Sequence, residues 1–463
     1  MKPPVVVILG AGHGTRMRSR TPKLLHPICG RAMIAWPVAA AREAGAQRVI
    51  VVDSPGEPLR PALDDGVTVA VQQQPLGTGD AVRAALPLIA ADDTVIVLYG
   101  DVPLLGTPTF RALAAAHASS GSQATITTTV LEEPSGWGRI VRAADGSVAK
   151  IVETREPGDA TDQERQICEV NTGLYAFDGG ALADALARIT DDNAQGEYYL
   201  TDAARLVAAA GGLVSAHRLA DATETLNVND RAALALARAI AQRAIHERHM
   251  LAGVTIVNPD ATVIDVDVRL GQDVTIEPGS ALHGHSSVGE GSTIGPHTTL
   301  RDVSVGRGSR VIHSYAVEAS IHDNVSVGPF AYLRPGAVLR NDSKAGTFVE
   351  IKNAEIGERT KVPHLSYIGD ATVGEDTNLG AATITANYDG HQKHRTTIGS
   401  HVHTSVDTTL IAPVTIGDHA HTGAGSAISE DVPEGALGIA RPRQTTIEGY
   451  DQRVRDRQRR QGK

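Results

Sequence analysis

Aliphatic residues recur at every sixth position from about residue 254 onward, and this repeat restricts the fold of the chain more than any other feature. The register shifts several times and then resumes. The recurring residues are Leu270, Ile276, Leu282, Val288, Ile294 and Leu300, then Val305, Val311 and Val317, then Ile321, Val327, Leu333 and Leu339, then Ile356, Val362 and Ile368, then Val373 and Leu379, and finally Ile398, Thr404, Leu410 and Ile416. So long a series predicts a repeat architecture.

The repeat has a direct physical interpretation. Six residues form one short strand and one corner, and the aliphatic side chain points inward onto its equivalents in the coils above and below. The small residue that often follows, as at Gly271 and Gly289, permits the tight turn. Three such sides close a triangular coil, so the sequence predicts a parallel β-helix. The spacing does not determine the hand of this β-helix. Crossovers between parallel strands are generally right-handed.

One interruption separates Ile384 from Ile398, where the segment Asn387-Tyr388-Asp389-Gly390-His391-Gln392-Lys393-His394-Arg395 is inserted. Such a segment is either a tolerated surface loop or a loop that lines a binding site, because insertions in solenoids often build the binding face. The nearby residues His364, Tyr367 and Asn378 favour the second interpretation.

The first 228 residues have a different pattern, in which apolar runs alternate with helical segments. The expected strands are 5–9, 49–52, 67–71 and 94–98, and the expected helices are 81–91 and 109–118. Continuous apolar strands between helices predict an α/β domain with a mostly parallel sheet covered on both faces. A hairpin over 139–143 and 147–152, around Asp145-Gly146, predicts some antiparallel pairing. A strong helix is expected over 230–251, with Asp230 able to cap its start.

Composition excludes several classes of protein. The length of 463 residues suggests two or three domains, and the net charge of -10 argues against a general nucleic-acid binder. The two cysteines, Cys29 and Cys168, do not make a disulfide framework and suit a reducing compartment. We find neither a signal peptide nor an apolar stretch that could span a bilayer, and we predict a cytoplasmic protein without membrane insertion. The basic tail from Tyr450 is interpreted as a solvated helix or a frayed end, with anion binding as the weaker alternative.

A glycine-rich turn follows the first expected strand, in the segment Leu9-Gly10-Ala11-Gly12-His13-Gly14-Thr15-Arg16-Met17. It is neither a P-loop nor the dinucleotide fingerprint, because no Gly-Lys-Ser/Thr closes it and its third glycine is misplaced. The exposed N–H groups of such a turn can bind a phosphate, with Arg16 and Lys23 adding positive charge, although an ordinary tight turn is the rival interpretation. Asp101 follows another strand at the edge where open α/β sheets bind ligands, which favours a magnesium ligand.

These motifs resemble the signature of the sugar-1-phosphate nucleotidylyltransferases. Further motifs narrow the resemblance: Gln72 with Leu76-Gly77-Thr78-Gly79, Tyr99-Gly100-Asp101, Gly136-Trp137-Gly138-Arg139-Ile140, Glu153, Asn171-Thr172-Gly173, and Asn193 with Tyr198-Tyr199-Leu200-Thr201-Asp202. Together with the repeat, they resemble the bifunctional N-acetylglucosamine-1-phosphate uridylyltransferase/glucosamine-1-phosphate acetyltransferase family, over about residues 5–449.

The resemblance implies site residues in the N-terminal half. UTP and the sugar phosphate would bind at Leu9, Gly10, Ala11, Gly12, Arg16, Lys23, Gln72, Gly77, Thr78, Tyr99, Gly100, Asp101, Gly138, Glu153, Asn171 and Asn229. Gly138, Glu153 and Asn171 would hold the sugar, Lys23 would contact phosphate, and Asp101 and Asn229 would bind Mg²⁺. No protein nucleophile is needed, because alignment and charge neutralisation carry such reactions.

The resemblance also implies an acetyltransferase site. His364 would be the general base, which suits a proton transfer near neutral pH. The amino-sugar phosphate would bind at Arg334, Lys352, Tyr367, Asn378 and Lys393, and acetyl-CoA at Ala381, Asn387, Tyr388, Ser405, Val406, Ala424 and Arg441. The chain departs from the family at Val406, where a serine usually contacts the cofactor, so either Ser405 replaces that hydrogen bond or it is absent.

The whole family pattern implies a bifunctional synthesis of UDP-N-acetylglucosamine, a precursor for the cell wall, by a homotrimer whose β-helix is left-handed. The expected domains are 1–229 for uridylyl transfer, a linker helix over 230–251, the acetyltransferase β-helix over 252–440, and an arm with the tail over 441–463. The alternatives are a single-activity nucleotidylyltransferase with a purely structural β-helix, and a non-catalytic assembly protein.

Overall fold

The computed structural model describes residues 2–12, 14–143, 148–152, 154, 160–193 and 196–462. The chain divides into two compact units, Met1–Ala244 and Ile245–Lys463, and the division falls within helix α7 (Arg231–Leu251). The helix predicted over 230–251 is confirmed, and the Asp230 carboxylate accepts a hydrogen bond from Ala233 N at 2.9 Å in its first turn.

The N-terminal unit is built on one mixed sheet with the strand order β11-β7-β10-β6-β1-β4-β5, to which the hairpin β8–β9 is added beside β10. Its strands are β1 (Val5–Leu9), β4 (Arg48–Asp53), β5 (Val67–Val71), β6 (Thr94–Tyr99), β7 (Ala124–Val130), β8 (Arg139–Arg142), β9 (Val148–Val152), β10 (Glu169–Asp178) and β11 (Val214–Arg218). All neighbours on the main path are parallel except β10, which runs antiparallel to both β6 and β7. The predicted fold class and the hairpin strands are therefore confirmed, while the turn around Asp145-Gly146 lies outside the described residues.

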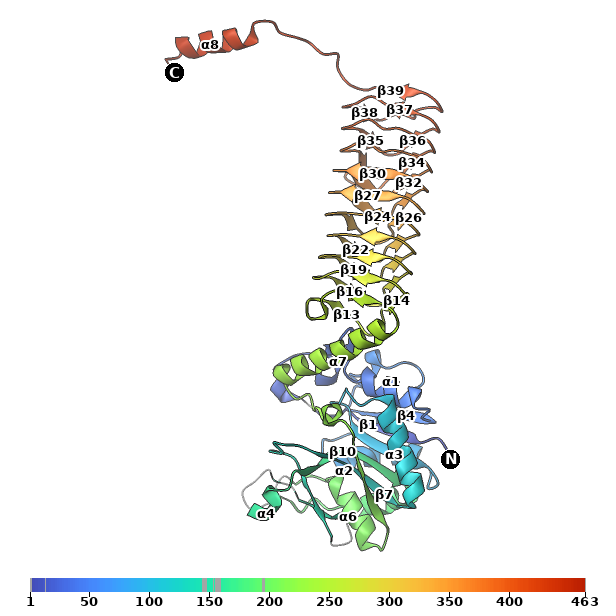
Figure 1. The fold of residues 1–463 in the computed structure, drawn as a ribbon, viewed down its shortest axis with the longest axis vertical. Coiled ribbons are helices and arrows are strands. Elements are labelled where there is room, and N and C mark those ends of the chain that lie inside the picture. Colours follow the sequence, from blue (N-terminus) through green and yellow to red (C-terminus); the bar gives the residue numbers. More distant parts are fainter. Residues whose placement is uncertain are drawn as a thin grey trace. The chain divides into compact units, whose positions relative to one another are not determined.

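Helices cover the sheet, as Figure 1 shows for α2, α3 and α6. The helices of this unit besides α7 are α1 (Ala35–Glu43), α2 (Thr78–Ala85), α3 (Thr107–Ser120), α4 (Asp162–Arg165), α5 (Gly179–Arg188) and α6 (Thr201–Ala209), and a short hairpin joins β2 (Pro27–Ile28) to β3 (Arg31–Ala32). The helix predicted over 81–91 is partly wrong: it begins at Thr78 and ends at Ala85, after which Pro87 lies in a 3-10 turn. Proline lacks an N–H and disfavours α conformation in the residue before it, which explains the early end.

The second unit contains three parallel sheets that wind as a β-helix, and Figure 1 shows its coils stacked from β13 to β39. From β12 to β32 every third strand pairs with its equivalent in the next coil, so each turn has three sides. In the later coils, isolated bridges between Lys361, Asn378, His403 and His421 continue the first side. The first sheet contains β12 (Thr255–Ile256), β15 (Thr275–Ile276), β18 (Thr293–Ile294), β21 (Arg310–Val311), β24 (Ser326–Val327), β27 (Lys344–Thr347) and β30 (Lys361–His364). The second contains β13 (Val263–Ile264), β16 (Ala281–His283), β19 (Thr299–Arg301), β22 (Tyr315–Val317), β25 (Tyr332–Leu333), β28 (Glu350–Lys352), β31 (Tyr367–Gly369), β33 (Ile384–Ala386), β35 (Thr409–Ile411) and β38 (Ala427–Ile428).

The third sheet completes the triangle. It contains β14 (Arg269–Leu270), β17 (Ser287–Val288), β20 (Ser304–Val305), β23 (Ser320–Ile321), β26 (Val338–Leu339), β29 (Glu355–Ile356), β32 (Ala371–Val373), β34 (Thr396–Ile398) and β36 (Val414–Ile416). The last strands, β37 (His421–Thr422) and β39 (Leu437–Gly438), pair with each other, and helix α8 (Tyr450–Arg460) forms in the basic tail.

The predicted inward residues are buried with two exceptions. Leu270 is only partly buried, in the first complete coil. Val317 is also partly buried, and its neighbour Ala316 is the buried residue that pairs with Leu300 and Leu333 in the adjacent coils. The prediction for Val317 was wrong because that side of the coil is one residue shorter than the six-residue count assumes, which brings a small side chain into the inward position.

Candidate functional sites

The glycine-rich turn after β1 is held tightly at the carboxyl edge of the sheet. Gly10 N donates to Val52 O of β4 at 2.8 Å, and Gly100 N donates to Leu9 O at 2.9 Å, which ties the turn to the end of β6. A Cβ atom on Gly10 would lie 2.6 Å from the Leu59 side chain, so a larger residue does not fit there. The turn is thus fixed where parallel strands end.

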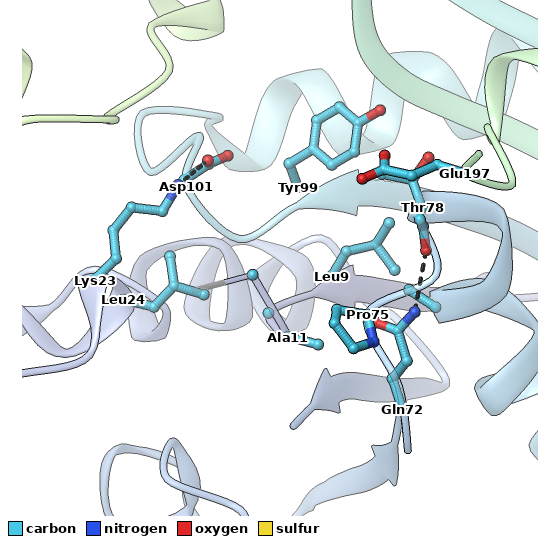
Figure 2. A pocket seen from close by; sticks show the side chains of 14 residues that line it. Leu9, Ala11, Lys23, Leu24, Gln72, Pro75, Thr78, Tyr99, Asp101 and Glu197 are labelled. Carbon is cyan, nitrogen blue, oxygen red and sulfur yellow. Dashed lines mark hydrogen bonds and ion pairs between the residues drawn. The ribbon is translucent and has the colours of Figure 1, made fainter. Parts of the chain in front are cut away.

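This turn forms one wall of a cavity of about 310 Å³, shown in Figure 2. Ten predicted site residues line it: Leu9, Gly10, Ala11, Gly12, Lys23, Gln72, Gly77, Thr78, Tyr99 and Asp101. Gln72 Nε2 donates to Gly77 O at 3.1 Å and to Asp80 Oδ2 at 2.8 Å, which fixes the loop before α2. The cavity therefore combines a fixed backbone with one lysine, Lys23, and two carboxylates, Asp101 and Glu197.

The loop before α2 is fastened from its other side by the segment around Tyr198. Gly79 N donates to Tyr198 O at 2.7 Å, and Leu200 N donates to Thr78 Oγ1 at 2.9 Å. A Cβ atom on Gly77 would lie 2.6 Å from Tyr198 O, and its φ of 111° is a conformation that favours glycine. Two motifs that are far apart in the sequence thus build one wall of the first cavity.

A second cavity of about 660 Å³ adjoins the first, and Tyr99 lines both. The predicted residues Arg16, Gly138, Asn171 and Asn229 line this second cavity. Asn171 is held by its own contacts, since its Nδ2 donates to Tyr175 Oη at 2.6 Å and its Oδ1 accepts from Gly173 N at 3.2 Å. Two predicted residues are not placed in either cavity. Gly100 packs against Ile34 and Leu24, while Glu153 lies outside the described residues.

Four polar residues converge where the two cavities meet. The ammonium of Lys23 forms a short ion pair with Asp101 Oδ2 and donates to Asn229 Oδ1 at 3.2 Å. Asn227, which the sequence analysis missed, donates from Nδ2 to Asp101 Oδ1 at 3.2 Å and accepts a hydrogen bond from Asn229 Nδ2. The alternation of Asn227 and Asn229 around the buried Val228 was the available signal.

This cluster fits a hard divalent cation in its donor types. One carboxylate oxygen and one amide oxygen already converge on a positive charge, that of Lys23, and Mg²⁺ prefers such oxygen ligands. Within the described residues there is no group of three or more His, Cys, Asp or Glu side chains that could hold a metal by themselves. Mg²⁺ commonly keeps waters and substrate phosphates among its ligands, so two protein donors are compatible with it.

In the β-helix, four predicted residues occupy equivalent positions in successive coils. Backbone hydrogen bonds connect these coils: Ala382 N donates to His364 O at 3.1 Å, Asp407 N to Ala381 O at 2.8 Å, and Gly425 N to Val406 O at 3.0 Å. We call this series, His364, Ala381, Val406 and Ala424, the corner row. His364 and Val406 are exposed, so the base candidate and the predicted cofactor contacts share one accessible edge.

The backbone at Ala381 has a free hydrogen-bond donor. Gly380 N, Ala382 N and Thr383 N donate to Thr404 O, His364 O and Gly380 O respectively. Ala381 N, by contrast, makes no hydrogen bond to any residue that the structure describes. The N–H of this predicted acetyl-CoA contact is therefore available in the coil next to His364.

The predicted phosphate-binding lysines belong to a network around a carboxylate. Lys352 Nζ lies 3.1 Å from Asp370 Oδ2, and Asn353 Nδ2 donates to Asp370 Oδ1 at 2.7 Å. Asn387, at the start of the inserted loop, also donates to Asp370 and lies 3.5 Å from Tyr367 Oη. The sequence analysis missed Asp370, which fixes both a candidate phosphate contact and a candidate cofactor contact.

Lys352 and Lys393 lie close together, and their pKa values are shifted in opposite directions. Partial burial lowers the pKa of Lys352, but the Asp370 carboxylate beside it outweighs burial and raises the pKa overall. The neighbouring Lys352 lowers the pKa of Lys393, which is exposed on the inserted loop. Arg334 forms an ion pair with Glu350 at 2.8 Å, and this contact raises the pKa of its guanidinium. Three cationic side chains are thus present, of which Lys393 loses its proton most readily.

The remaining candidate contacts of the β-helix lie on the inserted loop, in the coil of Ala381 and after β39. Asp389 holds the inserted loop, because its carboxylate accepts hydrogen bonds from Gln392 N at 2.6 Å and His391 N at 2.8 Å and lies 2.7 Å from His394 Nε2. These contacts, that with Gln392 first, lower the pKa of the carboxyl. Tyr388 projects from this loop and is exposed. Asn378 pairs by its backbone with Lys361 and His403, in the same coil as Ala381. Arg441 is exposed after β39 and forms no hydrogen bond or ion pair with other described residues, so the structure does not bring it to the site.

Comparisons with known proteins agree with the two folds. The model of the MobA-like NTP transferase domain matches residues 6–204, and the bacterial transferase hexapeptide model, with six repeats, matches residues 267–302. The chain is 48% identical over 462 residues to the bifunctional protein GlmU of Streptomyces avermitilis, covering 98% of this chain and 95% of the relative. It is 49% identical to the protein of that name from Mycolicibacterium vanbaalenii over 98% and 94%, and 45% identical to the one from Caldanaerobacter subterraneus subsp. tengcongensis over 96% and 97%.

The chain is thus a two-domain transferase with a nucleotidyltransferase unit and a hexapeptide-repeat unit. Identity of this extent over nearly the whole chain shows that it belongs to the GlmU family of bifunctional enzymes of UDP-N-acetylglucosamine synthesis. The predictions of fold class, family and a bifunctional enzyme are confirmed. None of the helices that the structure describes combines the length and hydropathy needed to cross a membrane.

Proposed function

We propose that the N-terminal unit joins UTP to N-acetylglucosamine-1-phosphate and releases pyrophosphate. The observation that carries this proposal is the pair of adjoining cavities that share Tyr99 and meet at Lys23, Asp101 and Asn229. The nucleotide would occupy the first cavity and the sugar phosphate the second, with Gly138, Glu153 and Asn171 at the sugar. Such an arrangement brings the two phosphates together at the cationic junction.

In the proposed reaction, an oxygen of the sugar phosphate attacks the α-phosphorus of UTP. A new P–O bond forms, the bond from the α-phosphorus to the bridging oxygen breaks, and pyrophosphate leaves with that electron pair. The N–H groups of Ala11 and Gly12 would hold phosphate oxygens, because Gly10 N already donates to Val52 O. Lys23 would neutralise charge as the bond breaks. No side chain needs to form a covalent bond, so orientation and electrostatics supply the catalysis.

Asp101 and Asn229 would hold Mg²⁺, which supplies positive charge to the phosphates when bound. The present partner of both residues is the ammonium of Lys23. Lys23 would leave the carboxylate and contact a substrate phosphate when the cation binds. The same side chain would therefore balance the charge of Asp101 in one state and that of the phosphate in the other.

We propose that the β-helix acetylates glucosamine-1-phosphate with acetyl-CoA. Arg334, Lys352 and Lys393 would bind the phosphate, with Tyr367 and Asn378 at the sugar. The amine nitrogen attacks the thioester carbonyl, its proton passes to His364, and the C–S bond breaks to release CoA. The observation that supports this assignment is the corner row, where His364 lies one coil from the free Ala381 N–H that would stabilise the oxyanion.

Acetyl-CoA would extend along the corner row towards Ser405, Val406 and Ala424, with Asn387 and Tyr388 of the inserted loop beside it. Arg441 is exposed and follows the last coil, so its proposed contact with the cofactor requires the arm to fold back or to come from another copy. The exposed position of His364 is compatible with completion of the site by a neighbouring subunit in the proposed homotrimer. Analytical ultracentrifugation of the full chain tests the trimer. Neither Cys29 nor Cys168 forms a disulfide, which accords with the proposed cytoplasmic location.

The decisive experiment measures both reactions on one preparation. Glucosamine-1-phosphate with acetyl-CoA should release free CoA, and N-acetylglucosamine-1-phosphate with UTP should release pyrophosphate. Pyrophosphate formation without CoA release above background would instead support a single-activity enzyme whose β-helix is only structural. Omitting each acceptor in turn is the matched control, because it separates transfer from hydrolysis.

A further inference from the structure

The side chain of Asn227 has no part in the function proposed above, yet it lies between the two residues that would hold the cation. Its Nδ2 donates to Asp101 Oδ1 at 3.2 Å, and its Oδ1 accepts a hydrogen bond from Asn229 Nδ2. The two other ends of this chain, Asp101 Oδ2 and Asn229 Oδ1, both face Lys23 Nζ. Asn227 therefore contacts both candidate ligands and does not contact the position of the cation.

The backbone keeps Asn227 in this place. Val228, between the two asparagines, is fully buried, and its N donates to Asp101 O at 2.8 Å. Asn227 and Asn229 both line the second cavity on either side of this anchor. The segment is thus attached to the residue whose carboxylate it contacts.

The chemistry of the groups fixes the direction of every hydrogen bond in this chain. An ionised carboxylate only accepts, so Asn227 must present its Nδ2 to Asp101. Its Oδ1 then faces Asn229, which must donate from its own Nδ2. The consequence is that Asn229 presents its oxygen, and never its NH₂ group, to the position of the cation.

We propose that Asn227 is a positioning residue that fixes the amide of Asn229 and the carboxylate of Asp101 for binding the divalent cation. An amide is nearly symmetric in shape, so without Asn227 the side chain of Asn229 can turn its NH₂ group towards the cation at little steric cost. Residues that orient metal ligands in this way typically change metal affinity about 10- to 100-fold when removed. The inference rests on the proposed cation site of the uridylyltransferase.

The test uses the full chain with Asn227→Leu, which keeps the shape and removes both hydrogen bonds, and Asn227→Ala as a smaller change. Free Mn²⁺ is counted by electron paramagnetic resonance in the presence of UTP. Both variants should bind Mn²⁺ about 10-fold or more weakly than the unaltered chain. They should also require more Mg²⁺ for half-maximal pyrophosphate formation, with little change in kcat at saturating Mg²⁺. Acetyl transfer and thermal unfolding report whether each variant is folded.

Mn²⁺ affinity equal to that of the unaltered chain in either folded variant would overturn the proposal and leave Asn227 a structural role. If both variants failed to fold, Asn227 would be required for folding and the positioning role would be rejected. Failure of the uridylyl reaction itself gives a different result, since the unaltered chain would then form no UTP-dependent pyrophosphate while Mn²⁺ binding could still be compared.

Discussion

The two candidate sites are assembled in opposite ways. At the cavity junction of the N-terminal unit, Lys23 meets Asn229 across 206 positions of the sequence, and the residues come from several strands and loops. In the corner row, His364 and Ala381 are brought together by backbone pairing between adjacent coils. The first geometry depends on the whole α/β fold, and the second only on local register. Disturbance in one unit should therefore spare the chemistry of the other.

The largest effect that separates the two sites is expected from His364→Ala. Loss of the proposed general base should lower acetyl transfer about 10²- to 10⁴-fold, because a positioned base contributes a factor of that size. Uridylyl transfer should stay within about twofold of the unaltered chain. His285→Ala, at an exposed histidine on an earlier coil, is the matched control and should leave both rates unchanged. Parallel loss of both activities would contradict the separation of the sites.

The opposite result, loss of uridylyl transfer with acetyl transfer preserved, is expected from Asp101→Ala. Its carboxylate would supply one of two protein donors to the cation, a contribution of several kcal/mol, so uridylyl transfer should fall on the order of 10²-fold or more. The rate of acetyl transfer, measured by CoA release, should not change. Thermal unfolding is the necessary control, because removal of Asp101 leaves the Lys23 ammonium without its ion pair. Unchanged pyrophosphate formation would remove Asp101 from the proposed cation site.

A smaller effect is expected at the departure from the family pattern. Val406 is 49% exposed on the corner row, and Val406→Ser should add a hydrogen bond to the cofactor. One such bond contributes about 0.5–1.5 kcal/mol, so the KM for acetyl-CoA should fall about 2- to 10-fold with little change in the KM for glucosamine-1-phosphate. Ser405→Ala distinguishes the alternatives. A rise in the KM for acetyl-CoA in that variant would mean that Ser405 already makes the contact.

The smallest expected effect is a shift in pH dependence. Lys352 lowers the pKa of Lys393, so Lys393 loses its charge at a lower pH than an ordinary lysine. In the unaltered chain, kcat/KM for glucosamine-1-phosphate should fall as the pH rises through this lowered pKa. Lys352→Met removes the neighbouring charge, so the alkaline limb should move to higher pH although the overall kcat/KM is lower. An alkaline limb that does not move would show that Lys393 does not bind the phosphate in its charged form.

The sequence predicted the β-helix well because its determinants are local. Nearly every aliphatic residue of the six-residue count is buried, and the error at Val317 arose where one side of a coil is shortened by a residue. At the cavity junction, by contrast, the sequence pattern indicated Lys23 and Asp101, the resemblance supplied Asn229, and the role of Asn227 was missed. The role of Asp370 in the β-helix was missed as well. A hydrogen bond between side chains 126 positions apart leaves no periodic signal in a single sequence. Only the folded sheet brings such residues together.

The inserted loop has a consequence for how this protein can change. Across the insertion, β32 still pairs with β34 in register, Thr372 with Thr397 and Val373 with Ile398, as adjacent coils do elsewhere without one. The insertion therefore only lengthens the connection between two coils. The entropic cost of closing such a loop grows slowly with its length. Selection can alter the length and chemistry of this loop while the coils on either side keep their pairing. The scaffold thus supplies a position where new specificity can evolve without a new fold.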